Sequence, residues 1–383
     1  MNTYDIGMEQ FQALMPDTHE DTLNELGNTS FALKNSLISN AFGTIYRSSS
    51  LSRFSRQLSI ISLLASESGN GSQLDKHVRA ALQSGVDPDE IISVIELISV
   101  YRGFPAALNA LTCINQILAS QSIHRIEANR YLELPDHTTT VYDSNNKKEP
   151  IVLVHALGLD WRMWRDVIPN LETEFRVIAY DLRGFGSAAK APEAKDINDY
   201  AEDLRDILSL LQLPSAHIVG LSLGGSIAQA LCTSQPELFK TLTIIASTGW
   251  SFPAFRERKE AAIEQGLIDQ ISPSLTRWFT PDQLATNGWG VRYARDCVAR
   301  SHLGGWCAGW NALFKLNIDK QVEDIRVKTH IIAAECDLST PPVLMEKFCK
   351  IRNHTFTVIP NAPHMVGLTH PRELAASIVE NIK

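Results

Sequence analysis

One serine of this chain has the surroundings of a nucleophile. Ser222 is the centre of a Gly-x-Ser-x-Gly pattern that follows an apolar run and precedes a segment of helical composition, residues 227–231. This order predicts a strand, a tight turn and a helix, with Gly220 and Gly224 leaving room for the chain to fold back. The hydroxyl then projects from the sheet, and the backbone N–H of Leu223 lies at the helix start, where it can stabilise an oxyanion.

A nucleophilic serine needs a histidine and an acid, and both follow it in the required order. Asp337 comes directly after the apolar run 330–334, and His364 follows the apolar run 355–359. When a serine sits at such a turn, its acid and histidine are expected on loops after later strands. We therefore predict that Ser222 attacks, that His364 takes and returns its proton, and that Asp337 orients the histidine ring.

A second donor for the oxyanion is expected in the loop after the first central strand. The run 151–154 is fully apolar, and His155-Ala156-Leu157-Gly158 follows it directly. We assign the backbone N–H groups of Leu157 and Leu223 to the oxyanion hole. His155 is interpreted as a structural residue.

Strand-like and helix-like segments alternate from residue 126 to residue 383. The segment 198–211 places its apolar residues on one face, as an amphipathic helix does. Fully apolar runs suit parallel strands that are covered on both faces, and they lie at 151–154, 177–180, 217–219, 242–245 and 330–333. The alternation predicts one α/β domain with a parallel sheet, preceded by hairpin strands at 127–134 and 138–142.

Residues 248–320 interrupt this alternation and are predicted to form a helical lid. They contain five of the seven tryptophans of the chain. Buried aromatic rings serve lid packing and apolar substrate pockets equally well, so both interpretations stand. Under the second interpretation Trp250, Trp278 and Trp306 bind substrate.

The first part of the chain, residues 1–125, is predicted to be a separate all-helical domain. Asp87-Pro88-Asp89-Glu90 has the composition of a helix start, with a capping residue, a proline at the first helical position and acids facing the helix dipole. The helix that follows, 91–101, is apolar on nearly every side. This pattern predicts burial in a helical bundle or in a subunit interface.

Composition and charge exclude several classes of partner. The net charge of −8 comes from interspersed residues with no long basic block, so neither nucleic acid nor an anionic membrane is expected to bind. No apolar stretch reaches the ~20 residues of a membrane span, and the N-terminal residues do not have the pattern of a signal peptide. The six cysteines are widely spaced, which is typical of buried, reduced thiols in a cytoplasmic protein. We expect no metal site and no cofactor.

Several strings in the helical part resemble the carboxymuconolactone decarboxylase family. They lie at 41–43, 51–56, 77–82 and 100–109, and Tyr-x-Gly-Phe-Pro-Ala-Ala in the last is the most specific. The resemblance covers most of residues 25–120. It implies a small all-helical domain that assembles into rings, and therefore a homo-oligomer. His77 matches a position where the family commonly has histidine, and Glu96 is the other acid–base candidate for a second site.

The acid–base groups of that family are only partly present. Ser93 and Leu97 stand where relatives have Glu and either His or Gln, Glu96 lies at a different angle, and Phe42 replaces a tryptophan. The Cys-x-x-Cys pair of the redox branch is absent from the sequence, which excludes peroxide reduction. A decarboxylase must protonate a carbanion or enolate as carbon dioxide leaves. We therefore interpret residues 1–125 mainly as an oligomerisation domain.

Residues 126–383 resemble α/β-hydrolases, and more narrowly 3-oxoadipate enol-lactonases. The matching strings are 154–160, 181–184, 220–225, 277–281 and 362–364. Enol-lactonases are expected to hold the substrate carboxylate with an arginine just after the sixth strand. Trp250 stands there in this chain, so Arg256, Arg258 or Arg295 would have to replace that arginine.

The sequence therefore predicts an α/β-hydrolase fold with a helical lid, preceded by an all-α domain similar to carboxymuconolactone decarboxylases. The expected activity is a serine hydrolase that cleaves a small lactone, enol-lactone or ester. One alternative is a bifunctional carboxymuconolactone decarboxylase and enol-lactonase of protocatechuate breakdown. Another is an assembly or ligand-binding protein whose hydrolase site is vestigial.

Overall fold

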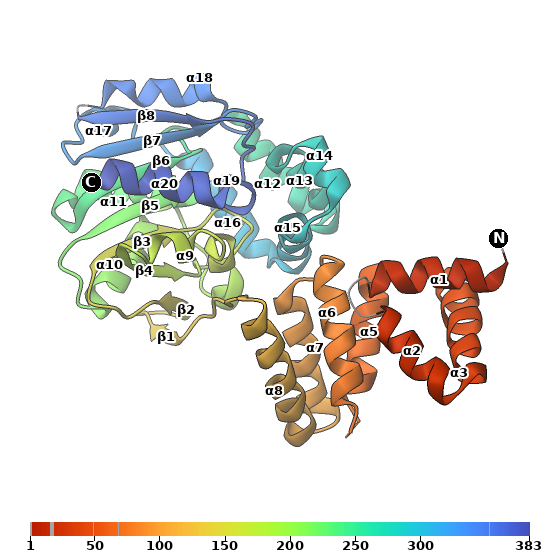
Figure 1. Ribbon diagram of the computed structural model, residues 1–383. Helices are drawn as coiled ribbons and strands as arrows, with labels where there is room; N and C mark the ends of the chain where they lie inside the picture. The colour runs from red at the N-terminus through yellow and green to blue at the C-terminus, as the bar shows by residue number, and fades with distance from the viewer. Residues whose placement is uncertain (1, 16–18, 49, 68, 352) are drawn as a thin grey trace. The chain divides into compact units, whose positions relative to one another are not determined.

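The chain folds into two compact units. The computed structural model describes residues 2–15, 19–48, 50–67, 69–351 and 353–383. The first unit is Met1–Arg125 and the second is Ile126–Lys383 (Figure 1). In the described residues no helix has both the length and the apolar character needed to cross a membrane.

The described part of the first unit is helical throughout. In chain order its elements are α1 (Thr3–Leu14), α2 (His19–Thr29), α3 (Phe31–Ser36), the π-helix η1 (Leu37–Ile45), α4 (Tyr46–Ser48), α5 (Arg53–Ala65), α6 (Gly71–Gln83), α7 (Pro88–Tyr101) and α8 (Phe104–Ser120). The start of α7 is the predicted one, because Asp87 and Glu90 form a capping box around Pro88.

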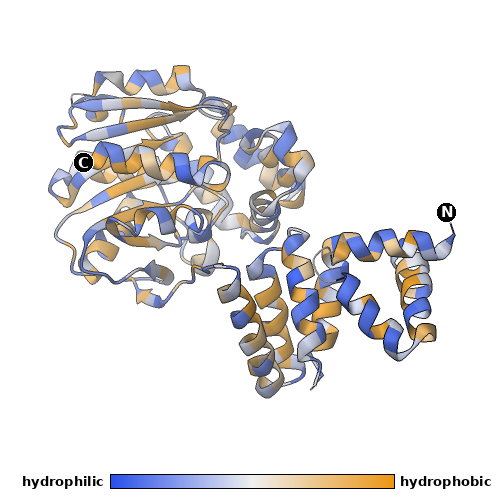
Figure 2. Cartoon of the chain, in the orientation of Figure 1, coloured by the Kyte–Doolittle hydropathy of each residue, from blue (hydrophilic) through white to orange (hydrophobic). Residues whose placement is uncertain are grey.

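Two apolar clusters hold the first unit together. The larger one joins α5 to α8 and includes Ile61, Val78, Ile95 and Ile114. The smaller one packs α1 against η1 through residues such as Phe11 and contains Phe42, the residue that stands in place of the family tryptophan. Figure 2 shows long hydrophobic stretches along α7 and α8.

The second unit is built around a sheet with the strand order β1-β2-β4-β3-β5-β6-β7-β8. Its strands are β1 (Arg130–Glu133), β2 (Thr138–Asp143), β3 (Glu149–Val154), β4 (Phe175–Tyr180), β5 (Ala216–Leu221), β6 (Phe239–Ile245), β7 (Thr329–Ala334) and β8 (His354–Ile359). The hairpin β1–β2 is antiparallel, β2 also pairs antiparallel with β4, and the pairs from β4 onward are parallel. The strand–helix alternation predicted from the sequence is confirmed.

The apolar runs became central strands because both faces of the sheet are covered. Val152, Ile178 and Ile218 are fully buried, as are their neighbours in the same strands. The covering helices include α9 (Ile168–Leu171), α10 (Ile197–Leu210), α11 (Leu223–Ser234), α17 (Asp319–Glu323), α18 (Pro342–Met345), α19 (Val366–Thr369) and α20 (Pro371–Ile382).

The lid is helical, as the sequence predicts. It consists of α12 (Pro253–Gln265), α13 (Ile271–Trp278), α14 (Pro281–Thr286), α15 (Trp289–Arg300) and α16 (Leu303–Lys315). Figure 1 shows α12 to α15 grouped at one end of the sheet. The chain leaves the sheet after β6 to form this group and returns to it at β7.

The cysteines are more exposed than expected. The described cysteine side chains are free thiols: Cys232 and Cys297 are buried, but Cys113 and Cys307 are only half-buried and Cys336 is exposed. The expectation of buried thiols is therefore wrong for Cys336, which follows β7 in a surface turn.

Candidate active site

Ser222 lies in the turn between β5 and α11, in a strained conformation. Its φ and ψ angles are 54° and −118°, a combination that costs a non-glycine residue about 1–3 kcal/mol. The backbone N–H of Ser222 donates to the carbonyl of Ile245 at 2.9 Å, which ties the turn to the end of β6. Strain of this kind is retained where the surrounding structure enforces it, often at a reactive residue.

The two glycines of the pattern have the predicted steric role. A Cβ atom on Gly220 would lie 2.2 Å from the carbonyl oxygen of Gly224, and one on Gly224 would lie 2.2 Å from the carbonyl oxygen of Val154. Both contacts are with backbone, which cannot move aside as a side chain can. The turn therefore needs glycine at both positions.

His364 and Asp337 form a buried hydrogen-bonded pair. The distance between His364 Nδ1 and Asp337 Oδ2 is 2.8 Å, and both residues are almost fully buried. The other carboxylate oxygen, Oδ1, accepts from the backbone N–H groups of Ser339 at 2.6 Å and Thr340 at 2.9 Å. Asp337 thus orients the imidazole ring and leaves His364 Nε2 as the nitrogen that can serve a nucleophile.

The surroundings of Asp337 keep it ionised. Burial alone would raise the pKa of this carboxyl group, but the charge and hydrogen bond of His364 and the donors of Thr340 outweigh burial. The pKa of Asp337 is therefore lowered from its ordinary value. An ionised acid here favours the imidazolium that forms when His364 takes a proton.

Ser222 and His364 line the same cavity. Its volume is about 30 Å³, which is enough for about one water molecule. Three lid side chains also line it, namely Phe255, Trp278 and Trp310.

The two predicted oxyanion residues come from two different loops of the sheet. Leu157 follows β3 and lines the cavity, and Leu223 is the first residue of α11. The first N–H groups of a helix have no acceptor within the helix, so that of Leu223 is placed to donate to a bound oxygen. Behind the turn, Ser247 Oγ donates to the carbonyl oxygen of Ser222 at 2.6 Å.

His155 has a structural role, as interpreted from the sequence. Its Nε2 accepts from the backbone N–H of Leu182 at 2.8 Å, and its Nδ1 lies 2.8 Å from the carbonyl of Ala156. Complete burial lowers the pKa of His155 to about 4, so the ring is neutral near pH 7. It joins the loop after β3 to the loop after β4.

A network not predicted from the sequence joins the Leu157 loop to the lid. The Tyr293 hydroxyl, on α15, donates to Asp160 Oδ1 at 2.8 Å and accepts from the backbone N–H of Asp160 at 3.2 Å. Arg162 pairs with the same carboxylate at 2.7 Å. The carboxylate of Asp160 therefore fixes a lid helix to the loop that carries the second oxyanion donor.

The structure brings one of the three predicted tryptophans to the cavity. Trp278 lines it, together with Trp310, which was not predicted. Trp250 packs instead against Phe348, with ring centroids 5.1 Å apart. Trp306 is buried next to Gly158, where an added Cβ would lie 2.6 Å from its ring. Trp250 and Trp306 are therefore packing residues, and no pattern in the sequence distinguished Trp310 from the other lid tryptophans.

Only one of the three candidate arginines lies at the cavity. Arg258 lines the cavity. Arg256 is exposed, with its guanidinium 4.2 Å from the Phe314 ring centroid, and Arg295 donates to Asn287 Oδ1 at 3.0 Å. A cation therefore does lie beside Ser222, on the lid rather than at the end of β6.

The predicted second site is not assembled. His77 is half-buried, and its Nδ1 lies 3.4 Å from Gln57 Oε1. Glu96 is exposed on α7. Within the described residues the side chains of His77 and Glu96 form no hydrogen bond or ion pair with each other, and burial lowers the pKa of His77.

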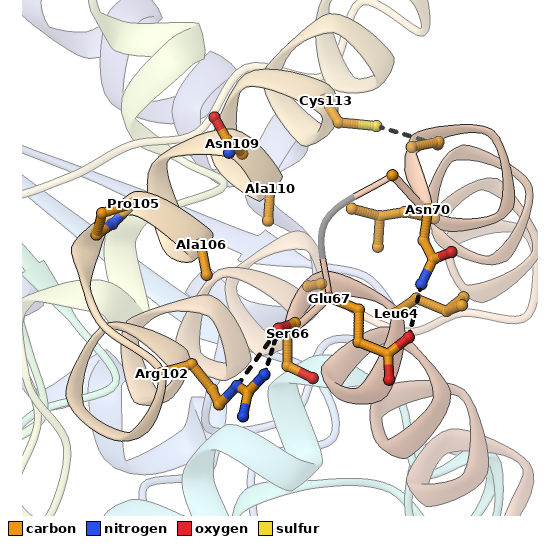
Figure 3. Close-up of a pocket in the computed structure, with 14 residues that line it drawn as sticks. Leu64, Ser66, Glu67, Asn70, Arg102, Pro105, Ala106, Asn109, Ala110 and Cys113 are labelled. Carbon is orange, nitrogen blue, oxygen red and sulfur yellow. Dashed lines mark hydrogen bonds between the residues drawn. The ribbon is translucent and has the colours of Figure 1, made fainter.

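A larger cavity of about 680 Å³ lies elsewhere in the first unit, between α5 and α8 (Figure 3). It contains neither His77 nor Glu96. Its charged residues are engaged locally, because Arg102 donates to the carbonyl of Ser66 at 3.2 Å and Glu67 accepts from Asn70 at 3.1 Å. This cavity is large, but its charged side chains do not form a pair that is free for acid–base catalysis.

One group of side chains in the described residues has the composition of a metal site. Ligand atoms of Asp136, His137 and Asp203 lie within 4.8 Å of one another. The guanidinium of Arg183 already bonds both carboxylates, to Asp203 at 2.6 Å and to Asp136 at 3.2 Å. This cation supplies the positive charge that a metal would bring.

Comparison with known families identifies the fold. Residues 149–371 match the model described as the alpha/beta hydrolase fold, which spans more than half of the chain. The chain belongs to this family. Residues 32–116 match the model of the carboxymuconolactone decarboxylase family. Both resemblances predicted from the sequence are confirmed.

Individual relatives match the second unit. The 3-oxoadipate enol-lactonase 1 of Acinetobacter baylyi is 29% identical over 227 residues, which cover 58% of this chain and 84% of that protein. The (E)-2-((N-methylformamido)methylene)succinate hydrolase of the same organism is 23% identical over 249 residues, covering 63% and 94%. The enol-lactonase structure from Burkholderia xenovorans LB400 has the same fold, with a TM-score of 0.62 at 21% identity, covering 66% of this chain and 99% of that one.

Proposed function

We propose that the second unit is a serine hydrolase that cleaves a small lactone, enol-lactone or ester through Ser222, His364 and Asp337. The observation that carries the proposal is the cavity lined by both Ser222 and His364, with Asp337 hydrogen-bonded behind the imidazole. The enol-lactonase and hydrolase relatives support the same class of substrate.

In the proposed reaction each of these three residues has one role. Ser222 Oγ attacks the carbonyl carbon while His364 Nε2 takes its proton, and the N–H groups of Leu157 and Leu223 hold the oxyanion. The C–O bond of the substrate then breaks, and His364 returns the proton to the leaving oxygen. Water, activated by His364, attacks the acyl-enzyme and releases the acid.

Covalent labelling tests this assignment. A fluorophosphonate probe should label the wild-type chain and should not label Ser222→Ala. The control is Ser234→Ala at the far end of α11, which should label like the wild type. Absence of labelling in the folded wild-type protein, or persistent labelling of Ser222→Ala, would overturn the proposal. A panel of esters and lactones run on the wild type and Ser222→Ala then identifies the bond that is cleaved.

We propose that the first unit serves mainly to form a homo-oligomer. Large apolar side chains on α7 and α8 are exposed, among them Val100 at 76%, Tyr101 at 81% and Phe104 at 70%. Exposed apolar patches of this kind mark interaction sites, and the mainly apolar sequence of 91–101 fits a helix buried partly in its own bundle and partly against another copy.

The bifunctional alternative has weaker support. The family match of residues 32–116 favours it, but Ser93 and Leu97 are exposed at the positions of the missing acid–base groups. Release of carbon dioxide from carboxymuconolactone that disappears in His77→Ala would establish it. The cytoplasmic location stays a prediction.

A further inference from the structure

The loop of residues 155–160, the Leu157 loop, is packed against the lid along its length. Across the residues that the structure describes, nothing accepts a hydrogen bond from the backbone N–H of Leu157. The Leu157 side chain contacts α16, since a Cβ added to Gly309 would lie 2.9 Å from Leu157 Cδ1. The direction of the Leu157 N–H is therefore set by the contacts of the loop around it and not by a bond of its own.

The strongest of these contacts joins Asp160, at the end of the loop, to α15 of the lid. The Tyr293 hydroxyl donates to Asp160 Oδ1 at 2.8 Å, and its oxygen accepts from the backbone N–H of Asp160 at 3.2 Å. Cys297, one turn further along α15, places its thiol 3.6 Å from Asp160 Oδ2. All three residues are buried. One hydroxyl thus holds both the side chain and the backbone of Asp160.

The protonation states of Asp160 and Tyr293 make this bond charge-assisted. Burial alone would raise the pKa of Asp160, but the hydrogen bond and charge of Arg162 and the Tyr293 hydroxyl outweigh burial, so the pKa is lowered. Burial, and next the charge of Asp160, hold the pKa of Tyr293 well above its ordinary value. Near pH 7 the carboxylate is therefore ionised and the phenol keeps the proton that it donates.

Two further lid contacts reach the loops of the active site. Gly158 has a φ of 80°, and a Cβ added to it would lie 2.6 Å from Trp306 of α16, so no side chain fits between this loop and the lid. The carbonyl of Trp278, at the end of α13, accepts from the backbone N–H of Met365 at 3.2 Å. Met365 directly follows His364. The lid thus contacts both the loop of the second oxyanion donor and the loop of the histidine.

We propose that Asp160 and Tyr293 are positioning residues of the hydrolase, whose hydrogen bonds hold the Leu157 loop against α15 and thereby place the Leu157 N–H in the oxyanion hole. The inference rests on the proposed hydrolase function and adds two residues to it. Neither residue lines the cavity that contains Ser222, so both act through Leu157. An oxyanion donor works only at about 2.7–3.1 Å from the oxyanion. A small shift of the loop should therefore slow attack by Ser222.

The rate of covalent labelling tests this role in the folded protein. When Ser222 attacks a fluorophosphonate, an O–P bond forms, fluoride leaves, and the phosphoryl oxygen lies in the oxyanion hole. Tyr293→Phe keeps the ring and removes the hydroxyl, so the second-order rate constant for labelling should fall at least about 10-fold, less than the 10²–10³ cost of losing a whole donor. An unchanged rate would overturn the inference and leave the hydrolase intact. No labelling of the folded wild type would overturn both.

A matched control separates this role from the general effect of removing a buried hydroxyl. Tyr200 is fully buried in the same unit, and its hydroxyl has no hydrogen-bond partner in the part of the chain that the structure describes. Tyr200→Phe should label at the wild-type rate. A slowing in Tyr200→Phe as large as that in Tyr293→Phe would show only a general effect of packing and would overturn the inference.

A double-mutant cycle tests whether the two residues act together. Asp160→Ala removes the carboxylate that Tyr293 binds, so adding Tyr293→Phe to it should slow labelling by less than about 3-fold further. Asp160→Asn keeps an oxygen that can accept from the hydroxyl, so it should lose less rate than Asp160→Ala. Losses in the two single variants that simply multiply in the double variant would show independent effects and would overturn the inference.

An inhibitor gives a direct measurement of the oxyanion hole. Ser222 Oγ adds to the carbonyl carbon of trifluoroacetone, its proton passes to His364, and the carbonyl oxygen becomes the oxyanion. The inhibition constant should rise in Tyr293→Phe by about the factor by which labelling slows. An unchanged inhibition constant would show that the hole is intact and would overturn the inference. If circular dichroism shows that Tyr293→Phe does not fold, the same measurement on Asp160→Asn decides, with the same two outcomes.

Discussion

In the second unit, residues that are distant in the sequence meet at one cavity. Ser222 lies after β5, Asp337 after β7 and His364 after β8, and the lid covers them. In the first unit, the candidate acid–base residues do not meet: His77 bonds Gln57, and Glu96 faces away into solvent. A match to a family therefore indicates different things in the two units. In the second unit both the fold and a set of reactive groups that lie together are present, whereas in the first unit mainly the helical fold is present.

The larger cavity lies in the first unit, where the candidate acid–base residues do not meet. The cavity at Ser222 is about 30 Å³ and the one between α5 and α8 is about 680 Å³. Chemistry depends on which groups converge, since a catalytic group must lie within reach of the reacting atom. The small cavity is the functional candidate for this reason.

The largest expected effect of a single substitution is on catalysis in the second unit. Asp337→Asn keeps the shape of the side chain but can no longer favour the required tautomer of His364, so kcat for an ester substrate should fall by about 10⁴-fold. Steady-state rate measurements with an ester that the wild type cleaves give kcat for both proteins and so measure this loss. A fall below about 10-fold would show that Asp337 does not have the role of the triad acid.

A pair of glycine substitutions compares the backbones of the two units. Gly224→Ala places a Cβ 2.2 Å from the carbonyl oxygen of Val154, whereas Gly71→Ala, at the start of α6, meets nothing within 4 Å. Gly224→Ala should lower the free energy of unfolding by about 3 kcal/mol or abolish labelling of Ser222. Gly71→Ala should change it by less than about 1 kcal/mol. Urea unfolding measures both, and equal effects would contradict the steric account of the turn.

Disruption of the apolar face should separate assembly from catalysis. Val100→Asp puts a charge on the exposed face of α7, so the oligomer should dissociate while kcat per chain changes by less than about 2-fold. Light scattering after size exclusion measures the mass. The control is Glu96→Gln on the same helix, which should leave the mass unchanged. A wild type that is already monomeric would contradict the oligomer proposal.

The sequence predicted most of the second unit because its signals are local. Apolar runs of three or four residues marked β3 to β7, and Gly220 to Gly224 marked the turn. Asp337 and His364 could be placed near Ser222 because each comes directly after a late apolar run, where the loops of this fold carry the acid and the histidine. Lid packing was not predictable in the same way, because Trp250, Trp278 and Trp306 differ in direction rather than in type. Three-dimensional packing of helices α12 to α16 decides which rings reach the cavity.

The surroundings of Arg277 illustrate the same limit. Residues 277–281 are one of the strings that resemble enol-lactonases, but a sequence does not show that the Nε atom of this arginine is buried without a hydrogen-bond partner. In the first unit the limit is different. Ser93 and Leu97 were identified as departures from the family pattern, and the structure places both on the exposed face of α7.

The smallest predicted effect concerns the pH dependence of the first unit. Burial holds the pKa of His77 below its ordinary value of 6.5. As pH falls below 6.5, the unfolded chain therefore takes up a proton on His77 before the folded chain does, and the folded state loses stability until the folded pKa is passed.

Gln cannot titrate, so His77→Gln should lose less stability than the wild type between pH 7 and pH 5. Urea unfolding at the two pH values measures this difference, while labelling of Ser222 at pH 7 should be unchanged. An identical loss in both proteins would show that His77 has the same environment folded and unfolded. A loss of labelling would show that the two units depend on each other.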